Sequence, residues 1–321
     1  MPSSPARVRD IESEQSERLA QVVAERARGE REGLFGPGSA TWTILRETAL
    51  LFGGPRALLL QLAHPSVAAG VAQHSVVAAD PLGRSVRTFS AVYTLCFGDL
   101  TSALAVVRGV RKRHAVVTGK SATGASYRAL DPALLRWVHA TLYDTAVRMF
   151  ETLVRPIDSP ERARFFDESK IVQMAFGVPP GEVLATPAAF DSYFASVLAS
   201  GELSVTPEAR TQWETLVRQP PSNALAGAFL LAPRRRATRL FDALPLRLSV
   251  RSALRLVAAG TLPERVRDAY GLKWGKAEAV AFDAVVGTIR TLWPRLPPVL
   301  RFHPAYRSAL ARFEPRYHRS P

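Results

Sequence analysis

The residues whose types and spacing could do chemistry lie in two stretches of the chain. Arg84, Arg87 and Thr88 come first, and His114 follows 26 residues after Thr88. Residues three and four apart meet on one side of a helix, so the first three form a polar face. A haem site requires an axial histidine in apolar surroundings, and cations can pair with the haem propionates. Two arginines, a hydroxyl and a histidine in an apolar helical chain therefore predict a haem pocket.

The spacing around His114 is helical. Apolar residues recur at steps of three and four through this segment, at Leu104, Val107, Val110 and Val117. We therefore predict that His114 lies in the apolar stripe of a helix spanning 101–117, which Gly119 ends. From spacing alone a second interpretation stays open, because a histidine on such a stripe is more often a core residue with a satisfied hydrogen bond.

The other histidines have simpler interpretations. His139 is the second candidate ligand, and its alternative is a core histidine bonded to a backbone carbonyl. His64 precedes a proline, and it either contributes to the pocket or orders a turn. His74 stands near a helix end, where a capping role is expected. His303 and His318 lie in a basic tail, where we expect solvated side chains.

The two arginines also have a structural alternative. They could mark an exposed helix start, but the apolar residues that follow them predict a largely buried helix. Buried arginines need partners. A propionate or a bound oxygen species would serve, and so would Asp80 or Asp99.

Motif searches exclude the familiar enzyme classes. The sequence contains no H-E-x-x-H, G-x-S-x-G, P-loop or G-x-G-x-x-G pattern, and no Glu-x-x-His pair for a di-iron bundle. The single Cys96 excludes an intramolecular disulfide and a cysteine-based zinc site.

The periodicities predict an all-α fold. Helical patterns run through most of the 321 residues, and no segment shows a convincing alternation typical of strands. Ser39 or Thr41 is expected to begin one helix, and Asp131 followed by Pro132 to begin another. We divide the chain into a charged helical arm (1–34), a catalytic domain (35–260) and a basic helical extension packed on that domain (261–321).

Charge and hydropathy restrict the partners. The net charge is +14, and residues 221–321 hold 18 Lys and Arg against 6 Asp and Glu. A basic half of this kind suits peripheral contact with an anionic membrane, or a solvated surface. Few aromatic residues interleave with the arginines, which disfavours nucleic acid. Without an apolar leader or a run of about 20 apolar residues, we expect a cytoplasmic protein.

Several ordered motifs together resemble one family, which includes the latex-clearing (rubber) oxygenases and the MpaB oxygenases. The resemblance covers roughly residues 35–260 and rests on the order and spacing of these pieces: the run from Arg56 through His64-Pro65 to Gly70, the run from Asp80 through Arg84 and Arg87-Thr88, Phe97-Gly98-Asp99, His114 with Gly119, Tyr127 with Asp131-Pro132, and Trp137-Val138-His139.

The resemblance implies a globin-like all-α core that holds haem b. It implies that His114 is the axial ligand of the haem iron, and that Arg84 and Thr88 line the opposite, distal side, where dioxygen binds. The rubber oxygenases carry a lysine where this sequence has Arg87, and arginine stays charged where lysine can lose its proton. They also carry a glutamate near the positions of His64 to Gly70, where this sequence has no carboxylate.

Two functions follow from these observations. The first is a haem b-dependent oxygenase that acts with dioxygen on a small hydrophobic substrate, isoprenoids included. The alternative is a non-catalytic helical protein that binds an apolar ligand or an anionic membrane surface.

Overall fold

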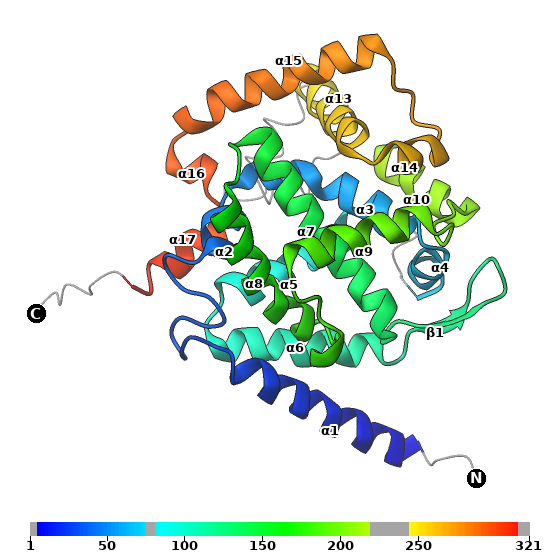
Figure 1. Ribbon diagram of the computed structural model, residues 1–321, viewed down its shortest axis with the longest axis vertical. Helices are drawn as coiled ribbons and strands as arrows, with labels where there is room; N and C mark the ends of the chain where they lie inside the picture. Colours follow the sequence, from blue (N-terminus) through cyan, green and yellow to red (C-terminus); the bar gives the residue numbers. More distant parts are fainter. Residues whose placement is uncertain (1–4, 75–80, 219–243, 314–321) are drawn as a thin grey trace, which may run out of the picture.

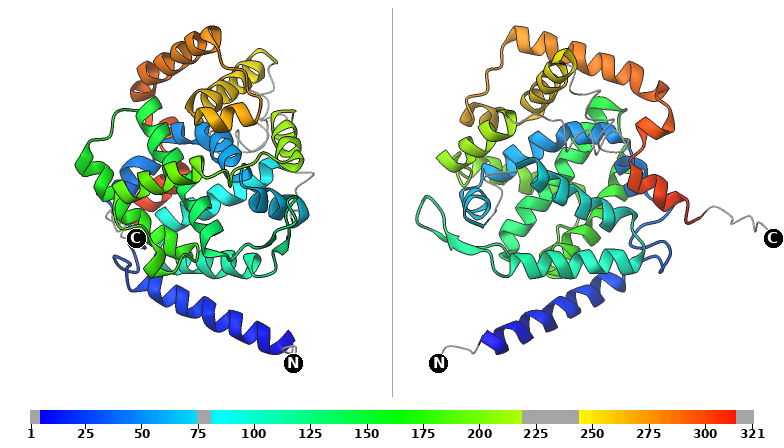
Figure 2. Two further views of the ribbon diagram at one scale, coloured as in Figure 1. Left: turned by 45° about the vertical axis from the view of Figure 1, so that its right-hand side comes forward. Right: turned by 180° about the vertical axis from the view of Figure 1, so that it is seen from behind.

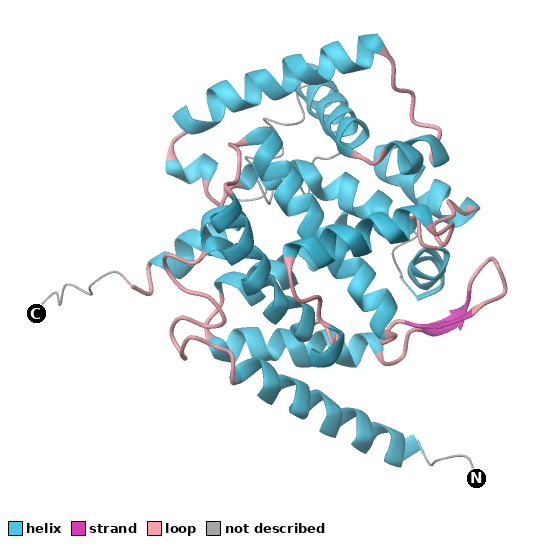
Figure 3. Cartoon of the chain, viewed as in Figure 1, coloured by secondary structure: helices cyan, strands magenta, loops and turns pink. Residues whose placement is uncertain are grey.

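A computed structural model describes residues 5–74, 81–218 and 244–313 of the chain. It confirms the all-α class, because helices account for most of the described residues (Figure 3). The elements of the first part are α1 (Pro5–Ala24), α2 (Ala40–Leu45), the 3-10 helix η1 (Thr48–Gly53), α3 (Gly54–Leu62), α4 (Pro65–His74), α5 (Pro81–Phe97), α6 (Leu100–His114) and the strands β1 (Thr118–Lys120) and β2 (Ser126–Arg128).

Further helices follow to the end of the described chain. They are α7 (Pro132–Leu153), α8 (Ser159–Ala175), η3 (Pro180–Glu182), α9 (Pro187–Ala199), α10 (Pro207–Arg218), α13 (Leu244–Thr261), α14 (Glu264–Ala269), α15 (Lys276–Leu292), η4 (Trp293–Arg295), α16 (Pro298–Arg301) and α17 (Pro304–Leu310).

Side-chain caps fix where the helices around the core begin. Ser39 Oγ accepts from the Trp42 amide at 3.1 Å, so it is Ser39 rather than Thr41 that caps α2. Asp131 Oδ1 accepts from the Ala133 amide at 2.8 Å and begins α7, as the Asp-Pro pair predicts. Each cap satisfies a backbone donor that has no partner inside its helix.

Helix α7 forms the centre of the molecule (Figure 1). It packs against η1, α3, α8 and α15, and its buried residues belong to the larger of two hydrophobic clusters. Gly53 in η1 permits one of these contacts, because a Cβ there would lie 2.5 Å from side-chain atoms of Thr145 and Met149. The absence of a side chain at position 53 therefore lets η1 approach α7 closely.

The second cluster joins α1, α2, α5, α6 and α8. The charged arm is part of this packing: α1 lies along α6, with Val23 fully buried, and the Arg108 guanidinium donates two hydrogen bonds to Glu17 at 2.7 and 2.8 Å. Figure 2 shows α1 along one edge of the molecule and α15 at the opposite edge.

A small antiparallel hairpin, β1–β2, was not predicted from the sequence. Its strands pair Thr118 with Arg128, Gly119 with Tyr127 and Lys120 with Ser126. Three residues in each strand are too few to give a recognisable alternation of apolar and polar side chains. Gly119, which we expected to end a helix, instead lies in β1.

A buried arginine ties three helices together. Arg56 of α3 is 2% exposed, and it donates to Asp144 Oδ2 at 2.5 Å, Thr145 Oγ1 at 2.6 Å and the Thr261 carbonyl at 3.0 Å. Desolvation by burial lowers the Arg56 pKa, while the carboxylate of Asp144 opposes that shift. The guanidinium thereby connects α3 to α7 and to the end of α13.

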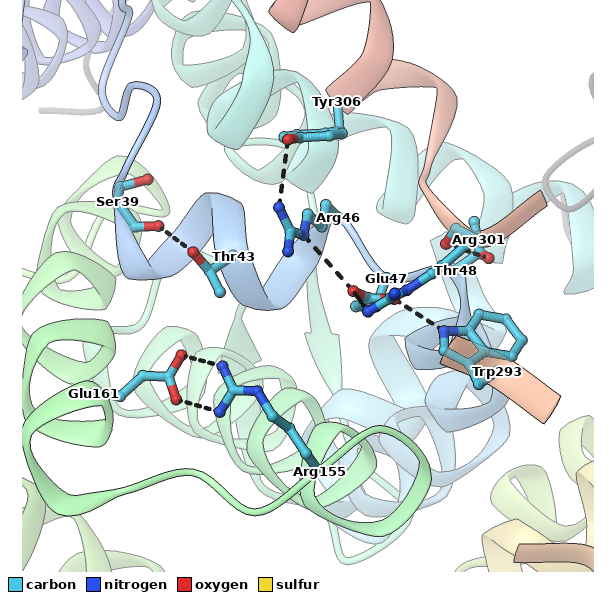
Figure 4. A network of polar contacts seen from close by, with 10 residues as sticks. All are labelled: Ser39, Thr43, Arg46, Glu47, Thr48, Arg155, Glu161, Trp293, Arg301 and Tyr306. Atoms are coloured by element: carbon cyan, nitrogen blue, oxygen red, sulfur yellow. Dashed lines mark hydrogen bonds and ion pairs between the residues drawn. The ribbon is translucent and has the colours of Figure 1, made fainter. Parts of the chain in front are cut away.

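A buried carboxylate anchors the C-terminal helices. Glu47 is 1% exposed and accepts two hydrogen bonds from Arg301 and one from Trp293 Nε1, all at 2.9 Å (Figure 4). Thr48 Oγ1 donates to the carbonyls of Leu300 and Arg301 at 2.8 and 2.9 Å. Residues 293–301 are therefore fixed to the start of η1.

The expectation of a solvated His303 is wrong. Its ring stacks on Tyr93 with centroids 3.6 Å apart, and its Nδ1 accepts from the Ala305 amide at the start of α17. Burial, aided by the charge of Arg307, lowers the His303 pKa to about 4. The basic composition of the tail concealed this contact, which joins residues far apart in sequence.

No helix in the described ranges is long and apolar enough to cross a membrane.

Candidate functional site

Several helix ends meet around the hairpin β1–β2, at the right of Figure 1. The end of α4 is bonded to it, because Gln73 Nε2 donates to the Lys120 carbonyl at 2.8 Å. The Ala129 amide donates to the Val117 carbonyl at 2.9 Å, which closes the loop between α6 and α7. The end of α6 and the start of α7 therefore lie together, beside the end of α4.

The predicted site residues of α5 and α6 can be compared by their distances from the turn that joins the two helices. The two helices pack against each other and are joined by the short turn Gly98–Asp99, so they run antiparallel. Arg84 lies about 21 Å before this turn and His114 about 22 Å after it, at 1.5 Å per residue. Measured along their helices, Arg84 and His114 thus lie at similar distances from the Gly98–Asp99 turn, and Thr88 lies one helical turn nearer to it.

His114 is the last residue of α6. The predicted helix ends three residues earlier than expected, because the Val117 amide bonds the His114 carbonyl at 3.0 Å as the chain turns into the hairpin. Val107 and Val110 are buried on the same helix, and the His114 ring is half-buried with its Nδ1 enclosed by protein atoms. The imidazole therefore stands at the end of the predicted apolar stripe.

The polar face of α5 is only partly described. Thr88 is half-buried, as are Phe89 and Val92. The expected burial holds nearer the end of the helix, where Leu95, Cys96 and Phe97 are each 1% exposed. Arg84 and Arg87 occupy the first turns of α5, but their side chains lie outside the described part of the structure, as does Asp80.

His64 joins α3 to α4 and also orders the turn. Its Nδ1 accepts from the Ser66 amide at 3.2 Å. Desolvation lowers its pKa, while the nearby carboxylates of Glu202 and Asp131 oppose that shift. Because Asp131 caps α7, His64 lies near the same group of helix ends as His114.

His139 lies two turns into α7 and is 3% exposed. Burial lowers its pKa to about 3, so the ring is neutral at physiological pH; a hydrogen bond with the Ser169 backbone opposes the shift. This bond matches the alternative of a core histidine bonded to backbone. Nδ1, however, is buried without a hydrogen-bond partner in the described part of the chain.

The three candidate histidines lie apart from one another. Within the described residues no three His, Cys, Asp or Glu side chains form a group that could hold a metal ion, so His64, His114 and His139 do not share one. A haem iron needs only one protein imidazole, with apolar walls and cations for its propionates. His114 offers one such imidazole, half-buried at the end of α6.

The contact between α4 and the hairpin was missed from the sequence. A Cβ on Gly119 would lie 2.5 Å from Gln73 Oε1 and 2.8 Å from Tyr127 Oη, and a Cβ on Gly70 would lie 3.3 Å from the Tyr127 ring. Tyr127 Oη in turn donates to Gln73 Oε1 at 2.9 Å. The sequence signal that could have indicated this contact was the presence of Gly70, Gly119 and Tyr127 among the ordered motifs.

Comparison with known proteins gives one family. Residues 41–291 match the family model described as "ER-bound oxygenase mpaB/B'/Rubber oxygenase, catalytic domain". The chain is also similar to the uncharacterized proteins Mb2261 of Mycobacterium bovis and Rv2237 of Mycobacterium tuberculosis. Each is 27% identical over 248 residues, which is 75% of this chain and 87% of the relative. No solved structure matches significantly.

The family model spans most of the chain and includes every helix end that meets at the hairpin, in agreement with the ordered motifs of the sequence. The chain therefore belongs to the family of the mpaB and rubber oxygenase catalytic domains.

Proposed function

We propose that this protein is a haem b-dependent oxygenase that acts on a small hydrophobic substrate, with isoprenoids as the first class to test. Family membership supports an oxygenase. The observation that supports the haem assignment is His114, a half-buried imidazole at the end of α6 whose Nδ1 is enclosed by protein atoms.

The residues divide into two roles in this proposal. His114 would hold the haem iron. Arg84 and Thr88 would supply a cation and a hydroxyl that stabilise negative charge developing on oxygen. When bound, haem supplies the redox chemistry with dioxygen that no side chain of this chain can perform.

Proton transfer is where this chain departs from the rubber oxygenases. Arg87 stays protonated, so it stabilises charge but does not accept a proton. No carboxylate occurs between His64 and Gly70. Since burial lowers the His64 pKa, that ring is neutral near pH 7. A reaction that needs no strong carboxylate base, such as cleavage of an electron-rich double bond, fits this set.

The experiment is oxygen uptake by the haem-loaded protein with short unsaturated isoprenoids, followed by mass spectrometry of products formed under ¹⁸O₂. We expect substrate-dependent uptake and ¹⁸O in carbonyl products, both lost in Thr88→Val without loss of haem. Haem-loaded protein that consumes no oxygen with any member of the series would contradict the oxygenase assignment.

A further inference from the structure

An apolar tip projects from the C-terminal part of the molecule. We use this name for residues 292–300, between the end of α15 and α16. Leu292, Val299 and Leu300 are 54%, 49% and 37% exposed, and the three prolines between them are exposed as well. Large apolar side chains exposed together on a soluble surface mark a contact with a partner or a membrane.

The tip is held rigidly at both ends by one buried carboxylate. Trp293 at its start and Arg301 just beyond its end both donate hydrogen bonds to Glu47 (Figure 4). Thr48 Oγ1 donates to the Leu300 carbonyl. The Leu300 backbone is therefore fixed while its side chain faces outward. Such preorganisation reduces the ordering entropy that binding would otherwise cost.

Positive charge surrounds the tip. Arg290 and Arg295 are exposed on either side of Leu292, and the sequence has no carboxylate from Ala284 to Phe313. Because the whole chain carries a net charge of +14, a second copy of it would be repelled. An anionic surface would be attracted.

The size of the tip favours a membrane over a protein partner. Stable protein interfaces bury about 1,600 Å² with matched shapes, and three apolar side chains with two arginines offer far less. A fluid lipid interface requires no matched shape, since apolar side chains insert and cations remain at the headgroups. Figures 1 and 2 place α16 and the hairpin on opposite sides, so docking here leaves the helix ends around His114 uncovered.

We propose that the apolar tip is a membrane-docking site, in which Leu292, Val299 and Leu300 insert between anionic lipids while Arg295 and the neighbouring Arg290 contact their headgroups. This inference is independent of the haem chemistry, because it rests on a different face of the molecule.

The test is co-sedimentation of the full-length protein with vesicles of phosphatidylcholine and phosphatidylglycerol, compared with phosphatidylcholine alone. Each arginine near an anionic surface changes partitioning about fivefold, so R290Q/R295Q should bind about 25-fold more weakly. V299S/L300S should bind at least tenfold more weakly. The matched controls, R26Q/R128Q for charge and Val116→Ser for exposed apolar surface, should each change binding less than twofold.

Insertion is read directly from Leu300→Cys labelled with an environment-sensitive dye, because Cys96 is buried and escapes labelling. A blue shift with anionic vesicles is expected. The proposal is overturned if the protein does not co-sediment with anionic vesicles at low salt, or if the control variants lose as much binding as the tip variants. It is also overturned if V299S/L300S instead dissociates a dimer in solution, which would make a second copy the occupant.

Discussion

Glu47→Gln should loosen the C-terminal helices from the rest of the molecule. The substitution keeps the shape of the side chain but removes the negative charge to which Arg301 and Trp293 donate hydrogen bonds. The new amide NH₂ group also faces these N–H donors. Breaking a buried ion pair costs about 3–5 kcal/mol. Glu47 is 1% exposed, but Arg301 is 24% exposed and keeps some solvation, so we expect about 3 kcal/mol, the low end of that range.

A matched control lies in the same region. Arg155 donates two hydrogen bonds to Glu161 at 2.7 and 2.8 Å, the same two-pronged geometry (Figure 4). Glu161 is 7% exposed, but Arg155 is 47% exposed against 24% for Arg301, so solvent screens this pair more. Glu161→Gln should therefore cost about 1 kcal/mol or less.

The assay combines urea unfolding with hydrogen exchange read by mass spectrometry. Amides of residues 293–313 should exchange about a hundredfold faster in Glu47→Gln, as a loss of about 3 kcal/mol implies. Those of α7 should change less. Equal effects of the two substitutions, or unchanged exchange in 293–313, would refute the argument that burial gives this carboxylate its importance.

Three further predictions concern the frame of the molecule. Asp144→Asn should destabilise the fold by about 3 kcal/mol in urea unfolding, because it leaves the buried Arg56 unpaired. Arg56→Met combined with Asp144→Asn should lower the free energy of unfolding by less than the sum of the two single substitutions, and additive losses would contradict the pairing. His303 should reduce stability as pH falls, because its folded pKa of about 4 lies below the unfolded value of 6.5, so the unfolded state binds the proton first. We expect the free energy of unfolding to fall by about 2 kcal/mol between pH 7 and pH 5. The same pH dependence in His303→Asn would contradict the assignment of this loss to His303. Gly119→Ala should displace Tyr127 from α4, and an unchanged Tyr127 environment by NMR would contradict the close contact.

Much of the local structure could be predicted from the sequence because its causes are local. The Asp131-Pro132 pair predicts the start of α7 from the bond that an aspartate makes two residues along. The apolar spacing before His114 predicts α6 because each step concerns one turn of one helix. The same reasoning placed the end of α6 three residues late, since the turn into the hairpin depends on pairing between β1 and β2.

Contacts between distant residues could not be predicted in this way. Glu47 meets Arg301 across 254 positions of sequence, and neither residue carries a local pattern that points to the other. His303 looked solvated because its neighbours are basic, and only the fold reveals Tyr93 against its ring. The candidate site has the same limit, since periodicity placed His114 on a helix while only the fold shows α5 packed against α6.

The most direct test of the account is the absorption spectrum of the full-length protein expressed with ample haem. We predict a Soret band and about one haem per chain, with both lost in His114→Ala and retained in His74→Ala, whose exposed ring contacts the Thr118 carbonyl and the edge of Tyr127. His139→Ala should also keep the band. A band that survives His114→Ala and disappears in His139→Ala would contradict the assignment of the axial ligand, and haem-free protein would contradict the proposed function itself.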